Sequence, residues 1–315
     1  PAPVSRFVIA HSDSAGGIMI RSTPGDAQSV DITFLDERGA DLSPAAQRKL
    51  ERVFSRQEFR RAFPGEIADL TFPSRMLDDY SQEVLSCIDT SGIAEAGLKI
   101  VIDTAGGTAA LVLPTLLGRI GVDVLTVNNR LDELSPSETP AEHMHALEHL
   151  GGLVASSRAA FGVRFDPVGE RIALVDERGA IVHDDRALLV LMDLVAAERH
   201  SGSIALPITT TRIAEDVARF HHVTARWAPT SPDELTKAAA ADGVIFAGDG
   251  RGGFVVPEFS TAIDGIASFV RLIGLVARTK LTLSQIDARI PQAHVLRKSV
   301  PTPWAAKGTV MRAVV

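Results

Sequence analysis

Apolar residues along this chain form short uninterrupted runs that alternate with longer amphipathic stretches, a pattern typical of strands alternating with helices. Apolar runs at 97–103 and 122–127 predict two buried strands, and the apolar stretch at 109–121 predicts a helix between them. A strand, a helix and a second strand in this order favour a parallel, right-handed βαβ unit. A third strand is expected at 159–166, followed by a hairpin strand at 171–179.

The part of the chain after residue 200 repeats this alternation. Strands are expected at 203–209, 223–228 and 243–248, with helices at 212–222, 231–241 and 261–278. Near the amino terminus, two strands at 16–20 and 29–36 precede a helix at 43–59, where Ser43 caps the first turn. Such alternation predicts a layered α/β fold that binds ligands at the carboxyl ends of its strands.

Shifts in the pattern divide the chain into four regions. We place them at 1–84, 85–199, 200–289 and 290–315. Three consecutive α/β units of similar length indicate a repeated architecture. The last region is a Pro-rich connector with one short element, and it is too small to form a domain.

Composition and charge narrow the classes of function. The formal charge is −7 at pH 7, which argues against nucleic acid or an anionic membrane surface as the main partner. The single cysteine, Cys87, leaves no intrachain disulfide and fits a cytoplasmic location. We expect no secretory signal at the amino terminus, and the apolar run at 187–197 is too short to span a bilayer.

Five segments carry motifs in a fixed order. They are GGIMIRSTPGDAQSVDITF (16–34), the segment 99–128 that begins KIVIDTAGG, FDPVGERIALVDERG (165–179), FAGDGRGG (246–253) and SVPTPWAAKGTVMR (299–312). In this order they resemble the phosphoserine segment, the start of the second domain, the magnesium loop, the sugar loop and the linker to the fourth domain of the α-D-phosphohexomutases. The resemblance runs along essentially the whole chain.

The resemblance implies consecutive three-layer α/β domains of phosphohexomutase type. Part of domain I, domains II and III and the start of domain IV are expected. The family moves phosphate between C1 and C6 of a hexose, using a phosphoserine, Mg²⁺, a sugar loop and a phosphate-binding loop. The early part of domain I and the rest of domain IV have no counterpart here, so the chain looks like a piece of a longer polypeptide.

The family's phosphoserine motif TASHNP aligns with the run from Arg21 to Asp26 and places Thr23 at the carrier position. A threonine hydroxyl can accept a phosphoryl group, but its extra methyl group crowds an in-line attack. Ser22 takes this role only with a shift of one residue. Pro24 replaces the family's histidine and has no backbone N–H. Because these residues are also strong turn formers, a surface turn without catalysis is the reading that we favour.

The segment FDPVGER aligns with the family's magnesium loop. Mg²⁺ prefers near-octahedral oxygen ligands, usually carboxylates together with phosphate and water. The family supplies three aspartates, whereas here Asp166 matches the first, Val168 replaces the second and Glu170 replaces the third. The resemblance therefore implies a weak magnesium site at Asp166 and Glu170, or none. The alternative that we favour is a solvated loop in which Glu170 or Asp166 pairs with Arg171.

The segment FAGDGRGG aligns with the family's sugar loop. Asp249, Arg251 and Gly253 stand where the family has Glu, Ser and His. Asp249 is shorter by one methylene group and Arg251 is bulky and cationic, so we do not expect the family's grip on the sugar hydroxyls. Arg251 is a candidate for bidentate binding of a phosphate, and Arg171 and Asp249 are the other candidate substrate ligands. The alternative is a plain hairpin with one exposed arginine.

Two hypotheses of function follow. The first is a degenerate mutase module, a pseudoenzyme with a structural, oligomerising or sugar-phosphate-sensing role in a larger protein. Mutase-like segments occur fused to sugar-phosphate nucleotidyltransferases, including mannose-1-phosphate guanylyltransferases. The second is an active phosphomannomutase/phosphoglucomutase that uses a phosphorylated Thr23 or Ser22 and Mg²⁺. The expected partners are a hexose phosphate, other domains of the same polypeptide and a second copy of the chain, and neither nucleic acid nor a membrane is expected.

Overall fold

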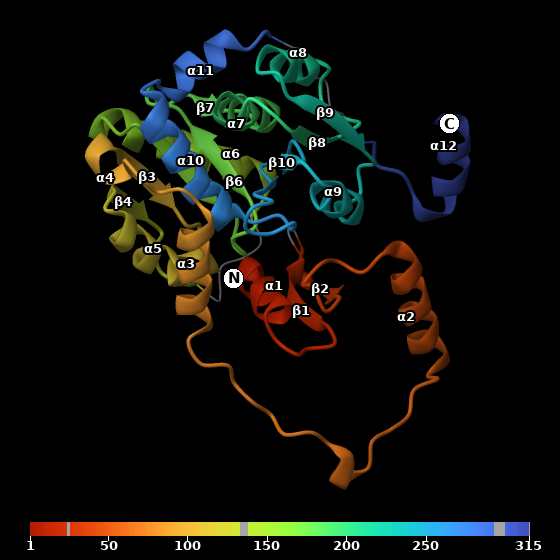
Figure 1. Cartoon of the computed structure of the whole chain (residues 1–315). Helices are drawn as coiled ribbons and strands as arrows, with labels where there is room; N and C mark the ends of the chain where they lie inside the picture. The colour runs from red at the N-terminus through yellow and green to blue at the C-terminus, as the bar shows by residue number, and fades with distance from the viewer. Residues whose placement is uncertain (24–25, 133–137, 293–299, 315) are drawn as a thin grey trace.

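A computed structural model of the chain describes residues 1–23, 26–132, 138–292 and 300–314. Within these residues it contains two sheets that are covered by helices, and a separate two-stranded hairpin near the amino terminus (Figure 1). The expected α/β fold is confirmed. No helix within these ranges is both long enough and apolar enough to cross a membrane.

The first large sheet has five strands and is built around the predicted βαβ unit. Its strands, in spatial order, are β4 (Asp123–Val127), β3 (Lys99–Asp103), β5 (Phe161–Phe165), β6 (Ile172–Val175) and β7 (Ile181–Val182). Strand β3 pairs in parallel with β4, as predicted, and also with β5, and β6 pairs antiparallel with β5 to form the predicted hairpin. The carboxyl ends of β3, β4 and β5 therefore meet at one edge.

Helices cover both faces of this sheet, and the residues of β3 show how. Val101 lies in a core cluster with Leu147 and Leu150 of α6 (Pro140–Ser157). Its neighbours Ile100 and Ile102 point to the other face, because side chains alternate along a strand. That face packs against α5 (Leu113–Ile120), α3 (Met76–Cys87) and α10 (Gly265–Thr279). The boundary expected between 84 and 85 lies inside α3.

The second large sheet has four strands. In spatial order they are β11 (Phe254–Val255), β10 (Val244–Gly248), β8 (Ser203–Pro207) and β9 (Thr224–Ala228). Strand β8 is parallel to both β9 and β10, and only β11 runs antiparallel. Helix α9 (Pro232–Ala239) packs on one face, and α8 (Ile213–Phe220) and α7 (Asp184–Arg199) lie on the other.

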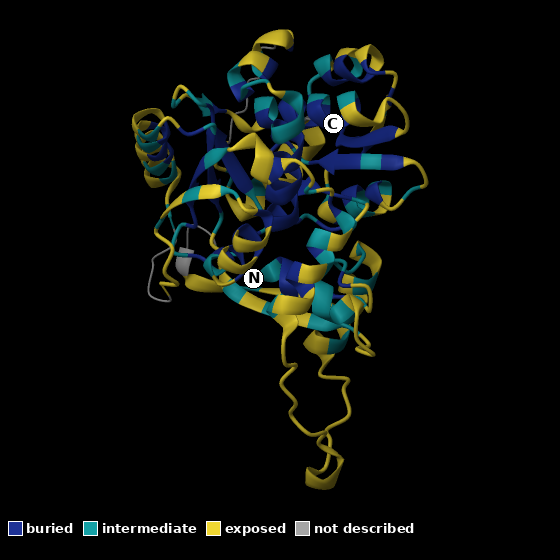
Figure 2. Ribbon diagram, turned by 60° about the vertical axis from the view of Figure 1, so that its left-hand side comes forward, coloured by how far each residue is buried: buried dark blue, intermediate teal, exposed yellow. Residues whose placement is uncertain are grey.

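Helices α7 and α10 join the two sheets through one buried core. Residues Ala187 to Ala196 of α7 are buried except Asp193, and every residue from Gly265 to Val276 of α10 is buried. Their side chains belong to a cluster that includes Ile102 of β3 and Ile204 of β8 (Figure 2). Helix α11 (Leu283–Arg289) packs against α7. Domains II and III thus share apolar packing.

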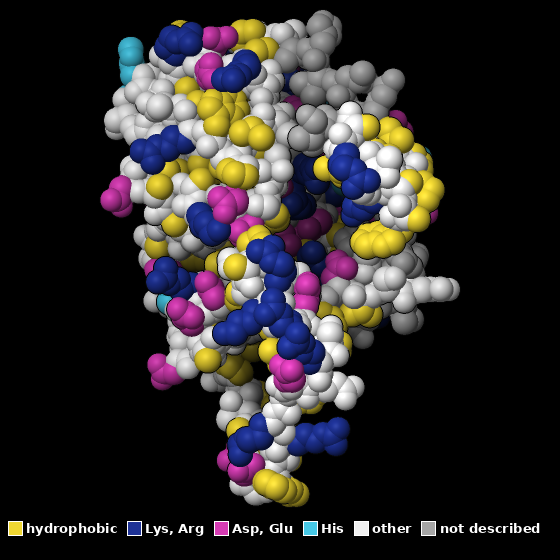
Figure 3. Space-filling model, turned by 90° about the vertical axis from the view of Figure 1, so that its right-hand side faces the viewer, with side chains coloured by type: hydrophobic (Ala, Val, Ile, Leu, Met, Phe, Trp, Pro, Cys, Tyr) yellow, Lys and Arg dark blue, Asp and Glu magenta, His cyan; other side chains and the backbone are white. Residues whose placement is uncertain are grey.

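The region before α3 is organised differently. It contains α1 (Ala2–Ala10), β1 (Gly17–Thr23), β2 (Asp26–Leu35) and α2 (Pro44–Arg56). The short helix α4 (Ile93–Ala96) lies outside this region, between α3 and β3. The hydroxyl of Ser43 accepts a hydrogen bond from the Ala46 N–H at 3.3 Å and caps α2, as predicted. No residue of α2 is buried, and Lys and Arg side chains gather over it in Figure 3. The short helix η1 (Pro64–Glu66) lies in the exposed segment 57–75.

Two further 3-10 turns and one helix complete the described elements. They are η2 (Thr108–Leu111), η3 (Trp304–Ala306) and α12 (Lys307–Val314). Figure 1 shows 57–75 as a long loop that leaves the body after α2 and returns at α3. Part of the expected connector, 293–299, and part of the Pro/Ser loop, 133–137, lie outside the described residues.

Candidate functional site

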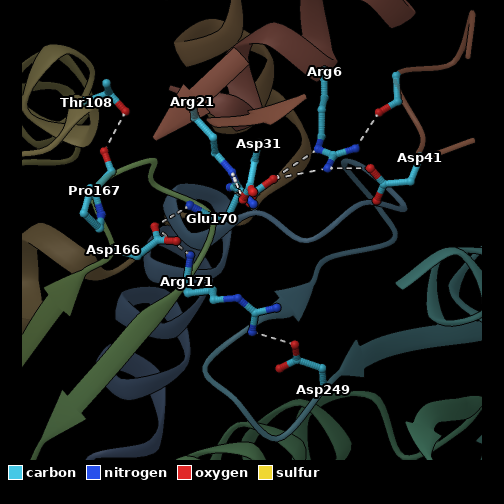
Figure 4. A network of polar contacts seen from close by, with 11 residues as sticks. Arg6, Arg21, Asp31, Asp41, Thr108, Asp166, Pro167, Glu170, Arg171 and Asp249 are labelled. Atoms are coloured by element: carbon cyan, nitrogen blue, oxygen red, sulfur yellow. Dashed lines mark hydrogen bonds and ion pairs between the residues drawn. The ribbon is translucent and has the colours of Figure 1, made fainter. Parts of the chain in front are cut away.

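The candidate metal loop connects β5 to β6 and is shaped by the Asp166 carboxylate (Figure 4). Its Oδ1 atom accepts hydrogen bonds from the backbone N–H groups of Glu170 at 2.8 Å and Arg171 at 3.2 Å. The Asp166 N–H donates to the Arg171 carbonyl at 3.0 Å, and Gly169 supplies a positive φ of 81°. One oxygen of this expected metal ligand therefore holds the turn itself.

Burial sets the charge of this carboxyl group. The pKa of Asp166 is raised to about 6, mainly by burial and also by the nearby Glu170 carboxylate, against the lowering effect of the Arg171 and Glu170 N–H groups. Desolvation disfavours the charged form of a carboxyl group. Asp166 is thus a weaker anion near neutral pH than an exposed aspartate, which does not favour cation binding.

The Glu170 carboxylate contacts two arginines from the amino-terminal region. Arg6 of α1 donates from Nε and Nη2 to Glu170 Oε1 at 3.3 and 3.2 Å. Arg21 of β1 donates from Nη1 to Oε2 at 3.1 Å. The carbonyl of Val168, which stands at the second metal-ligand position, accepts the Ala2 N–H at 3.0 Å. The expected pairing of Glu170 or Asp166 with the Arg171 side chain is therefore wrong, and Arg171 contacts Asp166 only through its backbone.

Arg171 instead reaches the candidate sugar loop. Its Nη1 atom lies 2.5 Å from Asp249 Oδ2 and 3.0 Å from the Arg251 carbonyl. Asp249 Oδ1 accepts the N–H groups of Arg251 at 2.8 Å and Gly253 at 3.0 Å. The structure thus brings two candidate substrate ligands, Arg171 and Asp249, together as an ion pair between domains II and III. Arg251 is an exposed residue of the turn.

Thr23 and Ser22 lie at the end of β1 and point to opposite faces of the hairpin. Thr23 Oγ1 donates to Asp31 Oδ1 of β2 at 2.8 Å, and Arg21 lies on the same face because side chains alternate. Ser22 is opposite Val30, on the outer face that also carries the exposed Ile20. Thr23, and not Ser22, therefore faces the magnesium-loop side. Pro24 lies outside the described residues.

The residues present do not fit a divalent cation. Among the described residues, no group of three or more His, Cys, Asp or Glu side chains is arranged to hold a metal. Of the two expected ligands, Asp166 caps its own turn and Glu170 is bracketed by guanidinium groups. Both Glu170 oxygens are bound to guanidinium groups, whose positive charge opposes that of an entering cation.

Sequence reasoning missed Arg6, because the helix that carries it was not predicted. Arg21 was considered only as the first residue of the run aligned with TASHNP. An arginine in place of the motif's threonine is a local sign that the charge of this site has changed. Asp31 and Asp41, which bind these arginines, gave no signal because their partners are distant in the fold.

Two domain models of one protein family match consecutive parts of this chain. The model for phosphoglucomutase/phosphomannomutase, alpha/beta/alpha domain II, matches residues 78–179, and the model for domain III matches 183–293. A phosphoglucomutase/phosphomannomutase of Thermococcus kodakarensis is 23% identical over 294 residues, covering 93% of this chain and 64% of the relative. A phosphoglucosamine mutase of Aliarcobacter butzleri is 24% identical over 291 residues, covering 91% of this chain and 65% of the relative.

A solved structure supports the fold. The phosphoglucomutase/phosphomannomutase family protein from Burkholderia thailandensis superposes with a TM-score of 0.79 at 19% identity, over 93% of this chain and 64% of that protein. The chain spans about two thirds of the length of these relatives. Because both domain models match in order and together cover most of the chain, it belongs to the phosphoglucomutase/phosphomannomutase family.

Proposed function

We propose that this chain is a phosphohexomutase module with impaired catalysis, which serves a structural or sugar-phosphate-binding role in a larger sugar-nucleotide biosynthesis polypeptide. One observation carries the proposal. The carboxylates at the metal and sugar positions, Glu170 and Asp249, are each bound by arginines of this same chain. A carboxylate held in this way is less available to Mg²⁺ or to a sugar hydroxyl.

Catalysis of phosphoryl transfer depends on positioning and on charge stabilisation acting together. Here the metal loop, the sugar loop and the carrier position all differ from the family pattern. A fold tolerates all three changes, because the core lies elsewhere, in α7, α10 and the two sheets. The combination therefore favours a retained scaffold over a retained reaction.

The larger context is also a proposal. The parent polypeptide that we propose is a mannose-1-phosphate guanylyltransferase fusion located in the cytoplasm, with a hexose phosphate, neighbouring domains and a second copy of the chain as partners. We propose that domain II begins with α3, because α3 packs against α5 and its first residue is Met76. The later boundaries stay at 199 and 289.

The alternative is an active mutase, and one contact favours it. The Thr23 hydroxyl donates to the Asp31 carboxylate at 2.8 Å, the arrangement of a hydroxyl next to a base. In this reaction Asp31 takes the hydroxyl proton while Thr23 Oγ1 attacks a phosphorus of a hexose bisphosphate. The new O–P bond forms on Thr23, and a hexose monophosphate leaves with the electrons of the broken O–P bond.

A coupled mutase assay on the complete polypeptide separates the two functions. The substrates are mannose 1-phosphate and glucose 1-phosphate, each with a hexose 1,6-bisphosphate activator. We expect no turnover above that of a blank. The matched variants are Thr23→Ala and Ser22→Ala, since Ser22 faces away from the loop. Turnover that disappears in Thr23→Ala and persists in Ser22→Ala would establish the active mutase instead.

A further inference from the structure

The environment of Glu170 is that of a carboxylate already bound to cations. Each of its two oxygens accepts from a different arginine, at 3.1 to 3.3 Å. The side chains of Glu170 and Arg6 are only 13% and 12% exposed. Charge-assisted hydrogen bonds of this kind are stronger than neutral ones, and partial burial reduces their screening by solvent.

The guanidinium group of Arg6 is held in place from its far side, and that of Arg21 lies near a second carboxylate. Arg6 Nη1 donates to the Gly39 carbonyl at 3.0 Å, and Nη2 donates to Asp41 Oδ1 at 3.1 Å. Arg21 Nε lies 3.7 Å from Asp31 Oδ2. Arg6 is therefore a fixed part of the site, and not a long side chain that swings aside when an ion arrives, and Arg21 lies between the carboxylates of Glu170 and Asp31 (Figure 4).

The balance of donors and acceptors points the same way. Arg21 Nε is buried and has no hydrogen-bond partner among the described residues. A metal site needs acceptor oxygens that are free to bind the ion, whereas the groups around the Glu170 carboxylate are donors. Both oxygens of Glu170 are bound by Arg6 and Arg21, so this carboxylate presents no uncompensated negative charge to a dication.

We propose that Arg6 and Arg21 take the place of a divalent cation at the 166–170 loop, so that the loop is closed and docked without metal. The arginines come from α1 and β1, and they tie the amino-terminal region to domain II at this point. They are positioning residues for Glu170. The inference deepens the proposed function and rests on it only for the identity of the loop, because metal binding and turnover are separate measurements.

The decisive measurement is a titration of the complete chain with Mn²⁺, followed by electron paramagnetic resonance. Wild type is expected to show no saturable site, and its Tm is expected to be the same in Mg²⁺ as in EDTA. Saturable binding of one Mn²⁺ that disappears in Glu170→Gln would overturn the inference. It would do so whether or not the polypeptide turned over hexose phosphate, so the proposed function is judged independently by the mutase assay.

A second measurement tests the arginines themselves. Arg6→Gln/Arg21→Gln is expected to lower the Tm, and Mg²⁺ is expected to restore part of the loss because the carboxylates are then unpaired. Arg38→Gln, at an exposed position of the same region, is the matched control and should keep the wild-type Tm. Equal Tm values for the double variant and the control would contradict the inference. If the double variant does not fold, Arg21→Gln alone is compared with the control.

Discussion

The pentapeptide Asp-Glu-Arg-Gly-Ala occurs twice, at 36–40 in the amino-terminal region and at 176–180 in domain II, and it folds into the same turn both times. In each copy the aspartate N–H donates to the alanine carbonyl at 2.9 Å, and the aspartate Oδ1 accepts from the arginine and alanine N–H groups at 2.8 to 3.0 Å. Local hydrogen bonding alone therefore decides the shape of this turn.

The surroundings of the two turns differ. Asp176 is 2% exposed, and Glu177 accepts a hydrogen bond from the Ser284 N–H of α11 at 3.3 Å. In the first copy Asp36 is only partly buried, and the Gly39 carbonyl accepts a hydrogen bond from Arg6 Nη1 at 3.0 Å. Domains II and III thus enclose their turn in packed structure, whereas the amino-terminal region uses its turn to support the arginine network. We expect the stability of the protein to depend mainly on domains II and III, and the geometry of the site to depend mainly on the amino-terminal region.

The largest expected effect is that of Gly179→Ala. Gly179 has a φ of 85°, and an added Cβ would lie 2.5 Å from the Gly151 carbonyl oxygen in α6. Left-handed strain and the forced shift of a packed backbone are together expected to cost about 3–4 kcal/mol in the free energy of unfolding. Urea unfolding followed by circular dichroism measures it.

Gly39→Ala is the matched variant in the other copy. Gly39 has a φ of 71°, and an added Cβ would lie 2.3 Å from the Arg6 carbonyl oxygen. Helix α1 has 9 residues against 18 in α6 and can shift more easily, so a smaller loss, about 2 kcal/mol, is expected. Equal losses in the two variants would mean that the amino-terminal region is packed as firmly as domain II.

The second expected effect is a change of stability with pH, and it arises in the buried core that domains II and III share. Burial raises the pKa of Asp264, the cap of α10, to about 6. Between about pH 4 and pH 6 the folded state holds a proton that the unfolded state has released, so stability falls as pH rises through this window, by about 3 kcal/mol at most. Asp264→Asn, which keeps an acceptor for the Tyr80 hydroxyl, is expected to remove the part of this decline that Asp264 causes and to leave the part that Asp166 causes.

Unfolding free energies at pH 4.5 and pH 7.5 test this expectation. Asp13→Asn, at an exposed position of the amino-terminal region, is the control. A wild-type stability that rises over this range, together with an unchanged slope in Asp264→Asn, would show that Asp264 is ionised in the folded state as readily as in the unfolded one.

Local and distant contacts also determine which helices and strands could be predicted from the sequence alone. The β3–α5–β4 unit and the β5–β6 hairpin follow from apolar periodicity and turn residues, which act over a few neighbours. Helix α1 escaped prediction because its buried residues, Pro3 and Val4, pack against distant parts of the chain and leave no local pattern.

The site shows the same division. Which residues occupy the loop could be read from the FDPVGER motif, and so could the missing carboxylate at Val168. The sequence could not show which side chains contact the loop. Arg6 and Glu170 are 164 positions apart, and nothing local to either residue specifies their contact. Only the fold brings α1 against this loop.

The third effect separates the two aspartates of the repeated turn. Asp176→Ala removes a buried carboxylate that accepts from two backbone N–H groups and from Arg178, so a loss of about 2–3 kcal/mol is expected. Asp36→Ala removes the same backbone contacts at a more exposed place, and about 1 kcal/mol is expected. If Asp36→Ala were the more damaging, support of the Gly39–Arg6 contact would outweigh burial.

The smallest effect is expected in the segment 57–75, where the contrast is most complete. Leu70 and Phe72 are 82% and 81% exposed, so replacing both with serine removes almost no buried apolar surface and should change the free energy of unfolding by less than about 0.5 kcal/mol. Trypsin is expected to cut first at Arg60 or Arg61 in this segment. A large loss of stability in Leu70→Ser/Phe72→Ser would mean that these side chains are covered in solution, and the amino-terminal region would then hold a core of its own.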